Sequence, residues 1–347
     1  MRNAVALLFA LVFLTSTALY GQPTNGPVYW STVQPDCSAL NQTAVLIRND
    51  AGTPVGYSCY ITGTFIWFAA GGDWNSYIRV AAPGFGAIGA DYTFYDNNGN
   101  NLSLDTTRGA ASARSSGRQV KFALAAHQPS ELRLLGTTSA APNYASTATG
   151  TVYAVFYCPN SVTCETLKPQ LFYSALPRFS WTMAAPIAWD KDSWTQWSGA
   201  GVDDGGSQRV SFVVYNQGSV ATSYRIRVFD RNGSLAGSGV TPQIPGFQVL
   251  PDGSAGEAGT YGALLSQVIT TPLPAGIFKI LIDGGAEPSS VEILQFTGAS
   301  ATTLEAGYDT AIGLPAIAAV TQQTSGGAQP VRRVPTPKGI FQPLPQD

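Results

Sequence analysis

Two short phrases in the sequence carry the oxygen-rich side chains that calcium prefers. DNNG at residues 96–99 and DRNG at residues 230–233 recur at one constant offset of 134 residues (230 − 96 and 233 − 99). A calcium loop of the EF-hand type needs glycine at its sixth position and glutamate at its twelfth. Counted from Asp96, those positions hold Asn101 and Thr107. Asn-Gly between apolar residues is instead a strong hairpin signal, so both phrases are predicted to be turns and no metal is expected.

His127 is the only histidine, so a Ser-His-Asp or Cys-His mechanism would have to use it. It lies in a predicted loop, AAHQP, and no G-x-S-x-G elbow supplies a nucleophile. No G-x-x-x-x-G-K-[ST] phosphate loop is present either. The sequence therefore names no catalytic residue and no cofactor, and a non-catalytic role is favoured.

Tryptophan rings and carboxylates lie close together in sequence at two places, and such pairs can bind sugars by stacking and hydrogen bonding. The predicted ligand-binding residues are Trp74, Trp189, Asp190, Trp194 and Trp197. Two other interpretations stay open: tryptophans between domains are often buried packing, and a glycosidase needs only two carboxylates that the fold brings together. The acidic candidates for that second interpretation are Asp73, Asp190, Asp192, Asp203 and Asp204.

The composition favours an uncharged surface. Charged residues make up 12% of the chain, about half of the roughly 25% that is usual in soluble proteins. A net charge of −2 gives no reason to expect nucleic acid or anionic lipid as a partner. Polysaccharide or another surface protein are the partners that this composition allows.

The first residues, MRNAVALLFALVFLTSTALYG, predict a secretory signal peptide. They combine Arg2, an apolar run over residues 4–14 and small residues before the expected cleavage site. A retained membrane helix is the alternative, but the apolar run is shorter than the ~20 residues that span a bilayer. We therefore expect a secreted, cell-surface or periplasmic protein with no membrane segment after cleavage.

Four cysteines in an exported chain predict two disulfides. Three pairings are possible, and the simplest joins Cys158 to Cys164 across the end of a hairpin, which leaves Cys37 with Cys59. A zinc site is the alternative, but the chain has no C-x-x-C pair to support it.

Strand signals dominate the chain, as runs of Val, Ile, Tyr, Phe and Thr separated by Gly, Pro, Asn and Asp. The one plausible helix is at residues 259–270, where a strand is nearly as well supported. The repeat marked by the two turns also extends along the strands. Four pairs of segments match: 77–80 with 211–214, 122–125 with 247–250, 151–157 with 277–283, and 171–176 with 291–296.

Two copies of one β module follow from this repeat, and short strands in modules of this size favour sandwiches. With its signal, its duplication and its F/Y-x-D-x-N-G phrase, the chain resembles bacterial secreted tandem modules of the immunoglobulin-like or fibronectin-like kind. The resemblance is general and implies no functional residue. The predicted fold is all-β, with two tandem antiparallel β-sandwich domains of related topology. The predicted divisions are a signal peptide at 1–21, a first module with an N-terminal extension at 22–185, a second module at 186–319, and a disordered Pro/Gln-rich tail at 320–347.

The function predicted from these features is that of a secreted, non-catalytic structural, adhesive or ligand-binding protein, with carbohydrate as the favoured small ligand. The alternative is a carbohydrate-active hydrolase whose carboxylates converge at the module junction.

Overall fold

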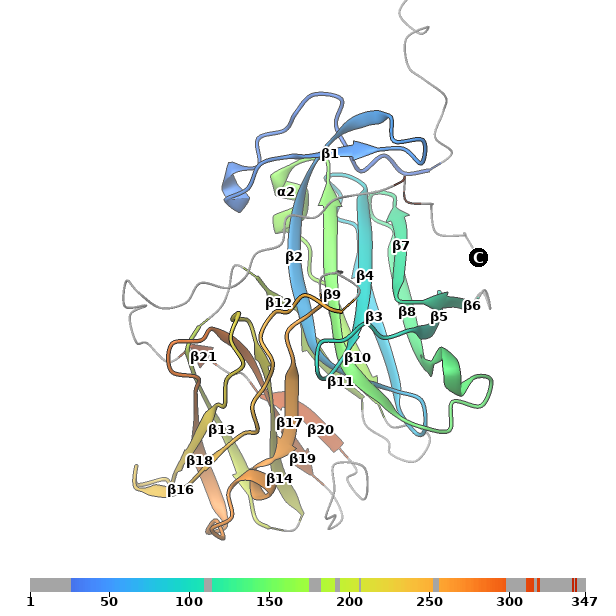
Figure 1. The fold of residues 1–347 in the computed structure, drawn as a ribbon. Coiled ribbons are helices and arrows are strands. Elements are labelled where there is room, and N and C mark those ends of the chain that lie inside the picture. Colours follow the sequence, from blue (N-terminus) through green and yellow to red (C-terminus); the bar gives the residue numbers. More distant parts are fainter. Residues whose placement is uncertain are drawn as a thin grey trace, which may run out of the picture.

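Figure 1 shows the computed structural model of the chain. It describes residues 26–108, 114–174, 182–190, 194–205, 207–251, 256–297, 310–314, 317–318, 339 and 341. Within these residues the protein is all-β, and the strands pair antiparallel in four sheets, two to each of two modules. The predicted signal at 1–21 and most of the predicted tail at 320–347 lie outside the described residues.

The first module packs a sheet of order β1-β2-β9-β4-β7, extended by β12 beside β2, against a sheet of order β11-β10-β3-β8-β5-β6. The strands of the first sheet are β1 (Val45–Arg48), β2 (Pro54–Ala70), β4 (Ile88–Asp96), β7 (Gln119–Leu124), β9 (Ala148–Cys158) and β12 (Ala188–Trp189). Those of the second are β3 (Asn75–Ala81), β5 (Leu104–Arg108), β6 (Arg114–Gly117), β8 (Pro129–Thr137), β10 (Gln170–Ser174) and β11 (Thr182–Pro186). Strand β2 is buried along most of its length, because other parts of the chain cover both of its faces.

The second module packs a sheet of order β16-β15-β18-β13-β21 against a sheet of order β17-β14-β19-β20. The strands of the first of these are β13 (Gln196–Asp203), β15 (Arg225–Phe229), β16 (Leu235–Val240), β18 (Gly276–Asp283) and β21 (Ile317–Ala318). Those of the second are β14 (Gln208–Asn216), β17 (Thr260–Leu264), β19 (Ser289–Thr297) and β20 (Thr310–Leu314). Figure 1 shows this module below the first, with its β14, β17 and β19 on the side that faces the first module.

The two modules share one topology, as the repeat predicts. The order β2-β9-β4-β7 in one sheet corresponds to β13-β18-β15-β16, and β11-β10-β3-β8 corresponds to β20-β19-β14-β17. Three of the four predicted segment matches fall on equivalent strands: β3 with β14, β9 with β18, and β10 with β19.

The fourth match, of residues 122–125 with 247–250, is wrong. In the first module β7 pairs with β4, but the equivalent place beside β15 belongs to β16, which follows directly after the 230–233 turn. The segment that carries β5 and β6 is inserted after the first turn, so the strand that completes this sheet comes later in the first copy than in the second.

Helices are short in the described parts of the chain: η1 (Ser38–Leu40), η2 (Thr138–Ala140), α2 (Ser161–Glu165) and α3 (Leu265–Val268). None of them is long and apolar enough to cross a membrane. The ambiguous stretch at 259–270 contains both predicted elements, strand β17 followed by α3.

Both predicted disulfides are present, Cys37–Cys59 and Cys158–Cys164. Cys59 faces Cys158 across the β2–β9 pair, so the two bridges lie at the same end of the first sheet. The second bridge joins Cys158 at the end of β9 to Cys164 within the single-turn helix α2, not across the hairpin end expected from the sequence. Disulfides of this kind suggest an oxidising, extracellular-type environment.

The change of module falls later than the predicted boundary at residue 185. Residues Ala188 and Trp189 pair with β2 of the first module, whereas Trp194 pairs with Ser289 of the second. Strand β12 therefore ends the first module, as β21 ends the second.

The outer face of the first sheet is covered by a further layer. It is formed by the N-terminal extension, which includes Tyr29 and Trp30, and by Phe341, of which only 3% is exposed. Phe341, which falls within the predicted tail at 320–347, is buried there among aromatic side chains.

Candidate functional site

The two predicted turns are present and have the same geometry. Asp96 Oδ1 accepts hydrogen bonds from the backbone N–H groups of Asn98 (2.8 Å) and Asn100 (2.9 Å). In the second copy Asp230 Oδ1 accepts the equivalent pair of bonds at 2.8 and 2.9 Å. Each turn has its glycine at positive φ, 81° at Gly99 and 80° at Gly233. The aspartate oxygens thus shape the turn, as the sequence predicts.

The first turn also joins the two modules. The backbone oxygens of Gly99 and Asn97 accept the N–H groups of Glu257 (2.9 Å) and Thr260 (3.0 Å). The side chain of Gln248 donates a third bond, of 2.8 Å, to the backbone oxygen of Asn98. The second turn differs at its glycine: among the described residues, apart from the chain neighbours, no atom lies within 4 Å of the place where a Cβ on Gly233 would be. The same local structure therefore serves as a docking element in one copy and as an exposed loop in the other.

Buried hydroxyl and carboxyl groups form further hydrogen bonds at the junction between the modules. Thr260 Oγ1 donates to the backbone oxygen of Ile66 in β2 at 2.8 Å. The Tyr215 hydroxyl donates to Glu257 Oε1 at 2.6 Å and accepts from Thr64 Oγ1 of the first module at 3.4 Å. Burial, with the nearby charges of Glu257 and Asp190, raises the pKa of the Tyr215 hydroxyl well above its ordinary value. These groups bond to each other out of contact with water.

One tyrosine–carboxyl pair crosses the junction, whereas the Tyr215–Glu257 pair lies within the second module. Tyr173 in β10 of the first module donates from its hydroxyl to Glu292 Oε1 in β19 of the second, at 3.0 Å. The other carboxyl oxygen of Glu292 is buried, and no described residue forms a hydrogen bond with it. Burial raises the pKa of Glu292 to about 7, although the tyrosine hydrogen bond acts in the opposite direction. This carboxyl holds its proton far more readily than an exposed glutamate does.

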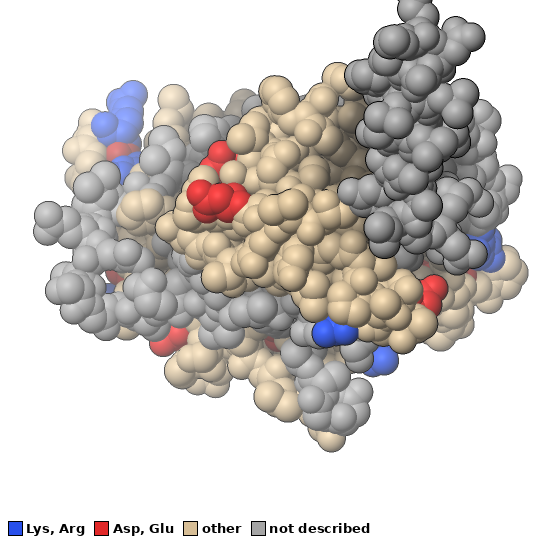
Figure 2. Space-filling model, turned by 90° about the horizontal axis from the view of Figure 1, so that it is seen from above, with Lys and Arg blue, Asp and Glu red and all other residues tan. Residues whose placement is uncertain are grey.

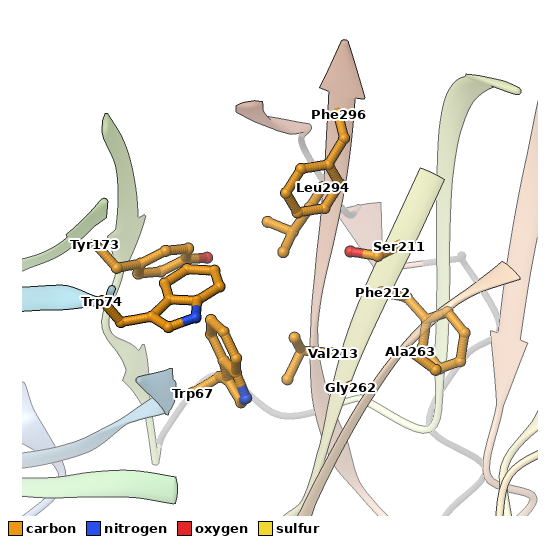
Figure 3. Close-up of a pocket in the computed structure, with 10 residues that line it drawn as sticks. All are labelled: Trp67, Trp74, Tyr173, Ser211, Phe212, Val213, Gly262, Ala263, Leu294 and Phe296. Carbon is orange, nitrogen blue, oxygen red and sulfur yellow. The ribbon is translucent and has the colours of Figure 1, made fainter. Parts of the chain in front are cut away.

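An aromatic crevice, which we call the junction crevice, lies between the modules (Figure 3). Its residues from the first module are Trp67, Trp74 and Tyr173, and those from the second are Ser211, Phe212, Val213, Gly262, Ala263, Leu294 and Phe296. Trp67 meets the edges of Trp74 and Tyr173 at ring-centre distances of 5.7 and 5.3 Å. The crevice has about 340 Å³ of space between atoms, part of it open to solvent.

The chemistry of the junction crevice is mainly apolar. In Figure 3 the rings of the first module face Leu294, Phe296 and Val213 across the gap. The Ser211 hydroxyl is buried at its edge and has no hydrogen-bond partner among the described residues. The crevice is therefore a narrow and mainly apolar gap with one hydroxyl group at its edge.

The predicted tryptophan platform is divided among three places. Trp74 is in the junction crevice, where only 7% of it is exposed. Trp189 is half-buried on β12, with its ring 6.1 Å from that of Phe156. Asp190 is buried beside Tyr215 at the junction.

The remaining two predicted residues lie in the second module. Trp197 is half-buried in β13 and donates from its indole N–H to the backbone oxygen of Ser289 at 3.1 Å. Trp194 precedes this strand and keeps 39% of its surface exposed. The five residues do not form a single surface, and only Trp74 lines the crevice.

Of the other candidates, Asp192 lies outside the described residues, whereas Asp203 and His127 have defined contacts in the fold. Asp203 Oδ1 lies 3.3 Å from the guanidinium of Arg209, and its other oxygen accepts from the backbone of Val210. His127 lies in the loop before β8, at positive φ and against Gly84. In the described residues no three His, Cys, Asp or Glu side chains gather in a way that could hold a metal ion.

The residues that form the crevice and its polar pairs were largely missed by the sequence reasoning: Trp67, Tyr173, Glu257 and Glu292. One signal was available for Glu292, because in SSVEILQF it shares a face with Leu294 and Phe296, where a carboxylate is out of place unless it is buried and bonded. No local pattern indicates that this face meets β10 of the other module.

The fold and the junction define a class, that of all-β proteins built from two fused sandwich modules of one topology. No family model, no curated protein and no solved structure matches the chain.

Proposed function

We propose that the protein is a secreted, non-catalytic structural or adhesive component whose two modules act as one stiff body. The observation that carries this proposal is the junction, where a turn, the Tyr173–Glu292 pair, the Thr64–Tyr215 hydrogen bond and an apolar contact hold the modules in one orientation. A fixed orientation suits a protein that bears load or spaces its partners. The resemblance to immunoglobulin-like and fibronectin-like modules agrees with such a role and stays a prediction.

The low charge of the surface favours an uncharged binding partner. Figure 2 shows a face of the molecule on which side chains other than Lys, Arg, Asp and Glu predominate and charges are few and scattered. Such a surface gives little electrostatic steering toward nucleic acid or anionic membranes. Neutral polysaccharide and other surface proteins remain the partners that we propose.

Co-sedimentation with insoluble neutral polysaccharides, together with size-exclusion chromatography, tests this function. We expect the purified protein either to bind a polysaccharide or to assemble with itself, and to release no reducing sugar. Turnover of any polysaccharide would refute the proposal.

If a ligand is found, the junction crevice is the site we propose for it. Trp67→Ala and Trp74→Ala should each weaken binding at least about tenfold, because each removes a ring from the crevice wall. Trp194→Ala is the matched control, since this tryptophan is exposed outside the crevice and its loss should leave binding unchanged. Equal losses in all three variants would contradict the assignment.

A second function, carbohydrate hydrolysis, is favoured by one observation. Asp190 and Glu257 both act electrostatically on the Tyr215 hydroxyl, so two carboxyl groups from different segments converge there. Both Asp190 and Glu257 are buried, which favours a structural role, because a glycosidase must admit water and a sugar to its two carboxyl groups. Asp190→Asn decides between the two functions: activity that this change abolishes in a folded protein would establish the hydrolase.

A further inference from the structure

Phe341 occupies an aromatic pocket, which we call the Phe341 seat, on the outer face of the first sheet. Its ring centre lies 5.2 Å from that of Tyr29 and 5.4 Å from that of Tyr157, the second contact being edge-on. The floor of the seat is Gly89 in β4, where a Cβ would come within 3.0 Å of the Phe341 ring and 2.9 Å of the Tyr29 ring. The absence of a side chain at this position makes room for both rings.

The seat also has polar groups, which contact both the backbone and the ring of Phe341. The backbone N–H of Phe341 donates to the Tyr29 hydroxyl at 3.2 Å. Lys121 places its ammonium group 5.6 Å from the Phe341 ring centre, in a position suited to a cation–π contact. Asp91 lies 3.5 Å from that ammonium group and holds it beside the seat.

A second contact lies two residues earlier in the same segment. Gly339 has a φ of +76°, and a Cβ there would come within 2.5 Å of the Asp50 carboxylate, which lies in the turn between β1 and β2. A side chain at this position would be strained by the backbone conformation, and the Asp50 carboxylate would have to move aside. The order Gly-x-Phe is therefore what this surface fits.

The segment and its seat are separate elements of the fold. Among the described residues, Phe341 belongs to no strand, and both sandwich modules have their sheets complete without it. Residues 319–340 connect it to β21, and an extended chain of that length reaches at most roughly 75 Å. The seat binds Phe341 through aromatic contacts, one backbone hydrogen bond and the ammonium group of Lys121. Complexes between domains and short peptides use contacts of the same kinds.

We propose that the Phe341 seat is a peptide-binding site, specific for a phenylalanine in a Gly-x-Phe segment, and that the chain fills it with its own Phe341. The occupant in cis competes with any second segment, because tethering gives it a high effective concentration, of the order of mM for short flexible linkers. This inference does not depend on the function proposed above.

The test uses the full-length chain with its own occupant removed, Phe341→Ala, and a fluorescent peptide of residues 336–345, TPKGIFQPLP. In fluorescence anisotropy the variant should bind the peptide saturably, and the wild-type protein should bind it at least about tenfold more weakly because its seat is filled. A peptide with alanine in place of the phenylalanine should not bind. Phe85→Ala is the matched control variant, since Phe85 is 66% exposed, and it should behave as the wild type does.

Gly89→Val in the Phe341→Ala background supplies a second variant, whose side chain fills the seat. With the fold verified by its thermal midpoint, this protein should lose the binding that Phe341→Ala shows. The proposal is overturned if folded Phe341→Ala protein binds no peptide, if it binds the alanine peptide equally well, or if filling the seat leaves binding unchanged.

Discussion

The duplicated turn allows one substitution to be made in two contexts. We predict that Gly99→Ala destabilises the protein far more than Gly233→Ala does. Both glycines have nearly the same positive φ, 81° and 80°, and both follow the same aspartate-capped turn. The backbone strain of an added Cβ is therefore common to both variants, at about 1 to 2 kcal/mol each.

The difference between the two variants comes from the module junction. A Cβ at Gly99 would lie 1.9 Å from the backbone oxygen of Glu257, whereas a Cβ at Gly233 meets no atom within 4 Å. Because the obstructing atom is backbone, a side-chain rotation cannot relieve the contact. Either the turn withdraws and loses hydrogen bonds worth about 1 kcal/mol each, or the junction is overpacked at about 1 to 3 kcal/mol. We expect an extra loss of about 2 kcal/mol in Gly99→Ala, roughly a 30-fold change in the unfolding equilibrium.

Urea unfolding of the two variants and the wild type, followed by tryptophan fluorescence, measures this difference. Small-angle X-ray scattering of the folded Gly99→Ala variant should also show a looser particle than that of Gly233→Ala. If the free energies of unfolding of the two variants agree within about 0.5 kcal/mol, the first turn does not join the modules and the argument for a stiff pair fails.

Two further predictions concern buried acid and the disulfides. Burial raises the pKa of Glu292 to about 7, so the folded state keeps a proton that the unfolded chain releases between the ordinary glutamate pKa and about 7. The protonated Glu292 therefore contributes its full stabilisation below the ordinary glutamate pKa. This contribution is lost as the pH rises through about 7. The urea midpoint of the wild type should fall more between about pH 5 and about pH 8 than that of Glu292→Gln, and equal falls would place the titration elsewhere. The bridges close loops with sequence separations of 22 residues for Cys37–Cys59 and 6 for Cys158–Cys164, so replacing each pair by serine should lower the free energy of unfolding by about 3 and about 2 kcal/mol respectively. Urea midpoints of the two double variants check this order, and the reverse order would contradict it.

The parts of the fold that the sequence predicted are those that local chemistry or repetition determines. Asn-Gly turns form through the φ of glycine and the capping of the preceding aspartate, and neither depends on distant residues. Equivalent strands were found where the two copies keep the same spacing, as for β3 and β14. The match of 122–125 with 247–250 failed because the first module has β5 and β6 inserted before the edge strand β7. In the second module the equivalent strand, β16, follows the turn directly. The pattern of apolar residues does not show this difference.

The candidate site was harder to predict because it is formed between modules. Trp74 was selected for its aspartate neighbour, but its partner in the crevice, Trp67, lies in the uninterrupted strand β2 and reads there as ordinary core. Trp189 and Trp197 were grouped by their closeness in sequence, yet they belong to strands of different modules. Neighbours along a chain that crosses a domain boundary point into separate cores, so short spacing is a poor guide there.

The junction is formed once because the two copies differ at the position that receives the turn. Thr260 faces Tyr215 across the β14–β17 pair, and at the equivalent place in the first module Pro129 faces Ala81 across β3–β8. The backbone N–H of Thr260 bonds to the first turn, and proline has no such group. The first module therefore lacks, at Pro129, the backbone donor with which the second module holds the turn at residues 96–99.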